Sequence, residues 1–301
     1  MRETLRYIMP PVLVQVAQRV RSFVGKKEPK DTGNDGLAEW EYVSQDWPSK
    51  TADAKIKGWN VNSVLDVYKA KWPAFIRQLE GSLPLCLSHE SDLSNPIDPI
   101  FHNITMSYGY ALGLASRLKT CISLLDWGGG IGHYYPISRA LIPDLTIDYY
   151  CKDVPILVEY GRQLFPQAHF YTDDSCLQQR YDFVLASTSL HYSENWRSTM
   201  RGLMGATGAY LFITQLPIIH HLPSFVMVQR PYAYGYETEY LGWCINRQQF
   251  LECAKASGVE LVREFIVGYQ PHIRHAPEQC EYRGFLFRSI TESGHVEPTK
   301  E

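Results

Sequence analysis

One short segment, residues 121–134, constrains the fold more than any other part of the chain. It reads Cys-Ile-Ser-Leu-Leu-Asp-Trp-Gly-Gly-Gly-Ile-Gly-His-Tyr, an apolar run that ends in Asp126 and leads into a cluster of glycines. A short apolar run beside turn residues is typical of a buried strand. Gly128, Gly130 and Gly132 can adopt positive φ, and without a Cβ they let the backbone approach a ligand closely. The segment therefore predicts a strand, a tight turn and an acid that faces a ligand.

The spacing of these glycines separates two classes of ligand. A dinucleotide-binding turn has Gly-x-Gly-x-x-Gly, and its third glycine would fall here on His133. The chain instead has Asp126-x-Gly128-x-Gly130-x-Gly132. This pattern resembles motif I of the class I S-adenosylmethionine-dependent methyltransferases, and the resemblance implies S-adenosylmethionine as cofactor. A glycine-rich turn that binds no ligand is the alternative interpretation.

Composition places the chain among ordinary globular proteins and argues against several other classes. Of its 301 residues 45% are apolar and 20% are charged, and the net charge of −3 gives no general attraction to nucleic acid. Seven cysteines without a Cys-x-x-Cys motif predict free thiols in a reducing cytosol. The spacing of histidines and cysteines does not indicate a metal site. No apolar run approaches the ~18 residues of a membrane span.

The region before residue 120 is predicted to contain three parts. In residues 1–27 apolar side chains recur at steps of three and four among arginines and lysines, which predicts an amphipathic helix. Such a helix can lie on an anionic membrane surface. Docking on the protein itself, or partial disorder, is the alternative and is slightly favoured. Residues 28–36 are polar and predict a linker. Residues 37–119 predict a helical cap, and residues 291–301 at the other end predict a flexible tail.

Strand and helix patterns alternate through residues 120–290, which we expect to form the cofactor-binding domain. The expected strands are 122–126, 145–151, 169–172, 181–187, 209–215, 261–267 and 283–288. Repeated βα units imply a parallel sheet, and a final strand pair without a helix implies an antiparallel edge. We therefore predict an α/β fold with a doubly wound, mostly parallel, seven-stranded Rossmann-like sheet. Residues 217–245 are predicted to be an insertion after the fifth strand.

Polar side chains follow the predicted strands at the sheet edge where ligands bind in open α/β folds. Asp153 stands 21 residues after Gly132, where a carboxylate could accept both ribose hydroxyls. Asp173 or Asp174 could accept from an adenine amino group. Taken singly, each acid is more often a helix N-cap or a solvated turn residue than a ligand-binding residue, and the combination with the glycine pattern carries the prediction. The predicted cofactor-binding residues are Asp126, Trp127, Gly128, Gly129, Gly130, Gly132, Asp153, Val154, Asp173, Asp174 and Ser187.

A narrower resemblance covers most of residues 40–290. The chain resembles a family of bacterial methyltransferases associated with surface-polysaccharide biosynthesis. The segments that carry this resemblance are Pro10–Pro11, His102–Ser116, Leu125–Tyr135, Lys152–Pro155 and Ser187–Tyr192. Two positions depart from the family pattern, because Asp153 stands where glutamate is expected and His191 where glutamine is common. The first change keeps a carboxylate, whereas the second argues against a general base at that position throughout the family.

Methyl transfer to a hydroxyl is helped by a base, and the ordinary histidine pKa of about 6.5 suits this task. His191 is the predicted base because it follows the fourth strand, although a structural role in the loop is an equal alternative. His133, His220 and His221 are the other histidines considered for this role.

Aromatic side chains are concentrated in the predicted insertion, and such rings stack on sugars while an arginine binds anionic groups. They could instead bury the loop or form a dimer contact. The predicted substrate-contacting residues are His133, Tyr192, His220, Arg230, Tyr234 and Tyr236.

The leading hypothesis is a cytoplasmic methyltransferase that acts on a sugar hydroxyl of a small-molecule or lipid-linked glycan precursor. Residues 1–27 would provide peripheral contact with the inner face of the cytoplasmic membrane. One alternative keeps the cofactor but changes the acceptor to an amine, a phosphate-type oxygen or a small natural product. The other is a non-catalytic adenosyl-binding scaffold protein. The sequence does not indicate whether the protein forms an oligomer.

Overall fold

The computed structural model describes residues 37–47, 55–87 and 98–290. The chain divides into two compact units, Met1–Leu37 and Ala38–Glu301, and every element below belongs to the second. The predicted amphipathic helix at 1–27, the linker at 28–36 and the tail at 291–301 lie outside the described residues. Among the helices that are described, none combines the length and apolar character needed to cross a membrane.

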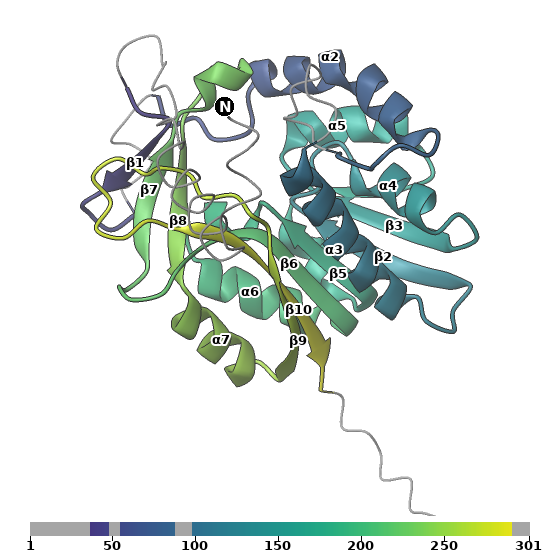
Figure 1. The fold of residues 1–301 in the computed structure, drawn as a ribbon. Helices are drawn as coiled ribbons and strands as arrows, with labels where there is room; N and C mark the ends of the chain where they lie inside the picture. The colour runs from purple at the N-terminus through teal and green to yellow at the C-terminus, as the bar shows by residue number, and fades with distance from the viewer. Residues whose placement is uncertain (1–36, 48–54, 88–97, 291–301) are drawn as a thin grey trace, which may run out of the picture. The chain divides into compact units, whose positions relative to one another are not determined.

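Seven strands form the predicted central sheet (Figure 1). They are β2 (Cys121–Trp127), β3 (Thr146–Lys152), β4 (His169–Tyr171), β5 (Tyr181–Ser187), β6 (Thr207–Ile219), β9 (Val259–Ile266) and β10 (Glu281–Ser289). Their spatial order is β4-β3-β2-β5-β6-β10-β9. The first five strands in this order run parallel to one another, and β10 runs antiparallel to both of its neighbours. The doubly wound, mostly parallel sheet and its antiparallel edge pair are therefore confirmed.

Three further strands enlarge the sheet to ten and correct the predicted count of seven. They are β1 (Trp40–Val43), β7 (Phe225–Gln229) and β8 (Tyr240–Asn246). β6 continues past its last pairing with β5, so Ile218 and Ile219 offer backbone groups to β8. β7 then pairs antiparallel with β8, and β1 with β7. The predicted insertion at 217–245 thus supplies strands, and the predicted helical cap at 37–119 contains one.

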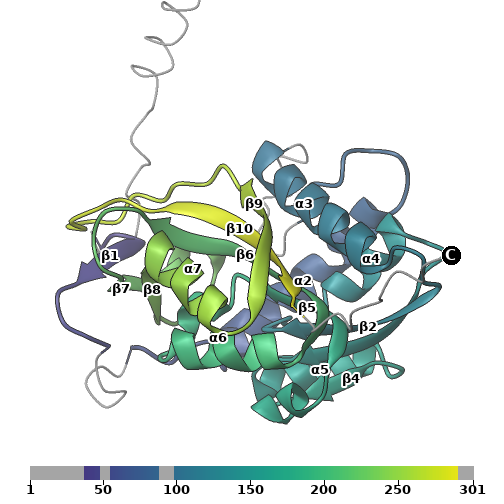
Figure 2. The same cartoon turned by 90° about the horizontal axis from the view of Figure 1, so that it is seen from below.

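Helices cover both faces of the central sheet. The α-helices are α2 (Asn62–Leu79), α3 (Pro99–Ala115), α4 (Tyr134–Leu141), α5 (Pro155–Leu164), α6 (Trp196–Gly205) and α7 (Arg247–Ala256). Side chains alternate along each strand, so neighbours in β5 face opposite sides. Val184 packs into the cluster that contains α6 and α7, whereas Phe183 packs into the cluster that contains α3 and α4. Figure 2 shows these helix pairs on opposite sides of β5 and β6.

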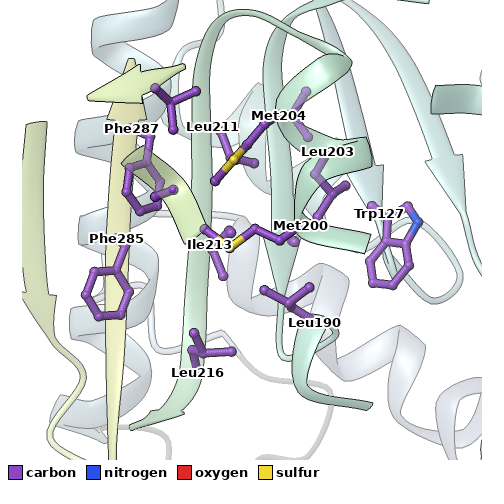
Figure 3. Close-up of a cluster of buried hydrophobic side chains, with 14 of the residues drawn as sticks. Trp127, Leu190, Met200, Leu203, Met204, Leu211, Ile213, Leu216, Phe285 and Phe287 are labelled. Carbon is purple, nitrogen blue, oxygen red and sulfur yellow. The ribbon is translucent and has the colours of Figure 1, made fainter. Parts of the chain in front are cut away.

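The cluster beneath α6 and α7 holds the centre of the sheet in place. Met200, Leu203 and Met204 of α6 meet alternate side chains of β6 and β10, among them Leu211 and Phe285 (Figure 3). All five are at most 4% exposed. Close packing of this kind leaves the strands little freedom to shift. The carboxyl ends of β2, β3 and β5 therefore provide a rigid edge for a site.

Candidate functional site

The glycine turn after β2 has the conformation that the sequence predicts. Gly128, Gly130 and Gly132 have φ values of +77°, +62° and +94°. The Gly128 amide donates to the Lys152 carbonyl at 2.7 Å, which ties the turn to the end of β3. A Cβ on Gly129 would lie only 2.4 Å from the carboxyl carbon of Asp126. The turn therefore requires glycine both for its backbone angles and for its space.

A cavity of about 350 Å³ lies beside this turn. That volume is within the range of small-molecule sites, about 300–1,000 Å³. Its wall combines the ends of β2, β3 and β5 with side chains of α2 and α3. Of the predicted cofactor-binding residues, it includes Trp127, Gly128, Gly129, Gly130, Asp153, Val154, Asp174 and Ser187.

Asp153 joins the glycine turn to the cavity wall. Its Oδ2 accepts from the Gly130 amide at 2.7 Å, and its Oδ1 accepts from the Val154 amide at 2.6 Å. Burial raises the pKa of Asp153, while the Val154 and Gly130 amides and the nearby Lys152 oppose that rise. A carboxylate offers about four lone-pair sites, so two remain for donors from a ligand. Asp153 can therefore hold the turn and receive ribose hydroxyls together.

Asp174 forms a second polar corner of the cavity. The Trp127 indole Nε1 donates to Asp174 Oδ1 at 3.0 Å, and Lys152 Nζ lies 3.4 Å from the same oxygen. Lys152 Nζ also lies 4.5 Å from the centroid of the Trp127 ring. Asp173 is not in the wall, and its side chain accepts from the Ser175 amide at 3.0 Å as a cap. Of the adjacent acids, only Asp174 reaches the cavity.

Asp126 and Gly132 were predicted to bind the cofactor, but the structure places both beneath the turn. Asp126 is fully buried and accepts a hydrogen bond from the Tyr149 hydroxyl. Its Oδ1 has no hydrogen-bond partner in the described part of the chain. A Cβ on Gly132 would meet the rings of Phe165 and Phe170 at 3.3 Å. Both positions support the turn from inside, and neither lines the cavity.

The structure also moves His191 away from the predicted role of base. The ring is fully buried and lies outside the cavity wall. It is tilted by 40° against the Tyr192 ring, with the centroids 4.0 Å apart. Burial lowers the pKa of His191 to about 3. Neither ring nitrogen has a hydrogen-bond partner among the described residues. A neutral imidazole enclosed in this way cannot reach an acceptor, so position 191 has a structural place in the fold.

Three of the predicted substrate contacts reach a cavity. His133 lines the cavity described above, with the Tyr68, Trp72 and Phe75 rings 5.0–5.5 Å from its own. Tyr192 lines the same cavity, and Tyr234 lines a second one beside it.

The other three predicted substrate contacts line neither cavity, contrary to the prediction. His220 Nε2 lies 2.8 Å from Glu281 on the surface. Arg230 pairs with Glu41 at 2.7 Å and with Glu239 at 3.5 Å. Tyr236 is fully buried. His221 likewise lies outside both cavities, where its amide donates to Glu278.

Several wall residues escaped the sequence analysis. They are Trp59, Tyr68, Phe75, Leu87, Phe101, Ile104, Tyr134, Ile137, Lys152, Leu157, Thr188, Ser189, Ser193, Thr199 and Gln215. Those from α2 and α3 precede the glycine turn along the chain, and helical periodicity shows that they are buried without showing what they face. Thr188 and Gln215 have φ values of +52° and +53°, a left-handed backbone that no local pattern indicated.

No protein-family model and no curated protein matches the chain. Among solved structures, it is similar to magnesium protoporphyrin IX methyltransferase from Synechocystis with bound SAM, at 13% identity and TM-score 0.41, over 74% of this chain and 94% of that one. It is also similar to a SAM-dependent methyltransferase from Methanosarcina mazei, at 16% identity and TM-score 0.43, over 58% and 96% respectively. A third is 1,6-didemethyltoxoflavin-N1-methyltransferase from Burkholderia thailandensis with bound S-adenosylhomocysteine, at 13% identity and TM-score 0.39, over 62% and 81%.

The buried carboxyl of Asp126 generates a prediction about stability. Burial raises its pKa from 3.8 to about 7, against the opposing Tyr149 hydrogen bond. The folded state therefore keeps a proton that the unfolded chain releases above about pH 4. The resulting stability is complete below that pH and is lost as the pH rises through about 7, at up to about 1.4 kcal/mol per pH unit.

Asp126→Asn imitates the protonated carboxyl and should remove this loss. We expect the free energy of unfolding of the wild type, minus that of the variant, to fall between pH 4 and pH 8 in urea titrations. The opposite pH dependence from His191 is common to both proteins and cancels in the difference. Parallel stability curves over this range would show that Asp126 is ionised throughout.

Proposed function

We propose that this protein is an S-adenosylmethionine-dependent methyltransferase and that the cavity beside the glycine turn binds the cofactor. The observation that carries the proposal is the hydrogen bond from the Gly130 amide to Asp153 in the cavity wall. It joins a positive-φ turn that excludes side chains to an acid with lone pairs left for ribose. Residues 120–290 would form the cofactor-binding domain, with side chains of α2 and α3 completing its wall.

The residues present fit the cofactor. A Cβ on Gly130 would lie 3.3 Å from the Tyr68 ring and 3.5 Å from His133 Nδ1, so glycine keeps this space open. Asp174, which follows β4 and lines the cavity, would accept from an adenine amino group. When bound, the cofactor supplies a sulfonium methyl that is already activated for transfer. The protein's task is then to bind, to align the acceptor and to receive its proton.

For the acceptor, we propose a sugar hydroxyl of a small-molecule or lipid-linked glycan precursor. Tyr192 and Phe101 in the cavity wall offer rings that could pack against a sugar. Some wall residues of this cavity also line a second cavity. An acceptor could therefore lie beside the cofactor, which favours catalysis over a non-catalytic scaffold. An amine, a phosphate-type oxygen or a small natural product is the alternative acceptor.

In place of His191, we propose His133 as the base that receives the acceptor's proton. Of the four histidines considered from sequence, His133 is the one in the cavity wall. Its ring is only 8% exposed and is oriented by the aromatic side chains around it. An imidazole in the cavity wall can take the proton of an acceptor that lies within hydrogen-bond reach.

The cofactor assignment is tested by Asp153→Ala. Loss of the charged acceptor should weaken S-adenosylhomocysteine binding by about 1–3 kcal/mol, because ribose hydroxyls are left without a partner. Asp148→Ala, at an exposed position of β3, the strand that Asp153 follows, is the matched control and should bind as the wild type does. Calorimetry gives both affinities, and circular dichroism checks folding. An unchanged affinity for Asp153→Ala would contradict the proposed ribose site.

The base assignment is tested by His133→Asn. Turnover should fall by about 10²–10⁴-fold, while S-adenosylhomocysteine affinity changes little. A panel of nucleotide sugars and lipid-linked sugars is first screened for a methylated member. Turnover of that acceptor is then measured as release of S-adenosylhomocysteine. His169→Asn, at an exposed strand position, serves as the control. Full turnover by His133→Asn would show that a group other than His133 takes the proton.

We further propose that residues 1–27 bring the protein to the inner face of the cytoplasmic membrane. The support is the basic, amphipathic sequence pattern alone. The full chain should then sediment with vesicles that contain anionic lipid and stay in solution with neutral vesicles. Equal behaviour with both kinds of vesicle would contradict electrostatic membrane contact.

A further inference from the structure

A second cavity of about 160 Å³ adjoins the proposed cofactor cavity. It is less than half the size of the first, which limits its occupant to a small group such as a single ring. The residues that line both cavities are Phe101, Ile104, Thr188, Tyr192 and Gln215. A molecule in the second cavity would therefore lie against the same wall as one in the first.

The boundary between the two cavities is built from strained backbone. Thr188 follows β5 and Gln215 lies in β6. Both have the left-handed backbone conformation that residues other than glycine rarely adopt. The Thr188 amide donates to the Thr214 carbonyl at 3.1 Å, which holds the two segments together. The side-chain amide of Gln215 donates from Nε2 to the Ser187 hydroxyl at 2.9 Å, and Ser187 lines the first cavity. Strain that is retained at such a boundary points to a functional edge.

Aromatic side chains dominate the wall of the second cavity. They are Trp40, Phe101, Tyr192, Tyr234, Tyr269 and Tyr282. Aromatic faces carry negative electrostatic potential, so they attract cations and polarised C–H groups and repel anions. Such a wall favours a polar ring that is neutral or positively charged.

The polar groups of the wall also disfavour an anionic ring. Glu39 and Asp98 contribute carboxyl groups, and among the described residues that line this cavity there is no lysine, arginine or histidine. Buried Gln229 accepts from the Tyr192 hydroxyl at 2.7 Å, which fixes one ring of the wall. Arg230 follows Gln229 in the chain, but its guanidinium pairs with Glu41 and Glu239 outside the cavity wall. An anionic group inside this cavity would have no described cation to bind.

We propose that the second cavity holds the acceptor, and that it takes one neutral or cationic polar ring of hexose or hexosamine size and rejects an anionic ring. This rests on the methyltransferase function proposed above. In the reaction, a ring hydroxyl oxygen forms the new bond to the methyl carbon, and the sulfur–carbon bond breaks with its electron pair on sulfur. The hydroxyl proton leaves to the base. The structure thus assigns acceptor selection to charge as well as to shape.

The test uses three sugars that differ mainly in charge: glucose, glucosamine and glucuronate. Their binding to the full chain is measured by saturation-transfer NMR, with and without saturating S-adenosylhomocysteine. We expect glucose and glucosamine to bind and glucuronate to bind at least about tenfold more weakly, the equivalent of one unfavourable charge contact. Tighter binding of glucuronate, or binding of none of the three, would overturn the proposed selectivity.

A matched pair of variants locates the site. Tyr234 lines the second cavity, whereas Tyr232, two residues earlier, donates its hydroxyl to Glu239 and lines neither cavity. Tyr234→Ala should weaken glucosamine binding by about three- to tenfold through the lost ring contact, and Tyr232→Ala should not. Equal effects of the two variants would place the sugar elsewhere.

Calorimetry with S-adenosylhomocysteine separates this proposal from the one on which it rests. Neither Tyr234 nor Tyr232 lines the first cavity, so both variants should keep the wild-type affinity for it. If S-adenosylhomocysteine binds but the sugars fail as described, only the acceptor pocket is wrong. If the wild type does not bind it at all, the methyltransferase proposal and the acceptor role both fail, whatever the sugars do.

Discussion

The site depends on one partly buried hydrogen bond, from the Gly130 amide to the carboxylate of Asp153. It links the turn after the first strand of the central sheet to the residue after its neighbour, and both are set by parallel pairing of β2 with β3. Such a bond is strong because its acceptor is charged, and losing it would leave a buried amide without a partner. The helices on both faces keep these strand ends in register, so the packing of the core determines the geometry of the site.

The extension of β6 beyond β5 adds three further strands to the sheet. Once Ile218 and Ile219 run past the end of β5, their backbone groups pair with β8, and β7 and β1 follow. These added strands bring Trp40, Gln229 and their neighbours to the edge where the proposed cofactor cavity ends. The second cavity exists because of this extension. A seven-stranded sheet alone would leave that side of the site without a wall.

Two wrong assignments share a physical origin. Asp126 and His191 both follow the expected strand pattern at the ligand-binding edge, yet one side chain points beneath the glycine turn and the other into the core. Position along a strand tells which edge a residue occupies. The direction of its side chain depends on local geometry. For Asp126 this is the pleat of β2, and for His191 it is the short 3₁₀ helix Leu190–Tyr192, which contains it. A residue beside a strand end can therefore support a site without touching its ligand.

The sequence by itself determined the alternation of strands and helices, the glycine turn and the place of Asp153 beside it. These follow from local causes: residue periodicity, the φ angles that only glycine adopts readily, and short connections between neighbouring strands. The tertiary structure alone decided which histidine reaches the first cavity, which acids line that cavity, and where β1 pairs. Those outcomes depend on contacts between residues far apart in the chain, such as Tyr68 of α2 beside the glycine turn, and no local pattern encodes them.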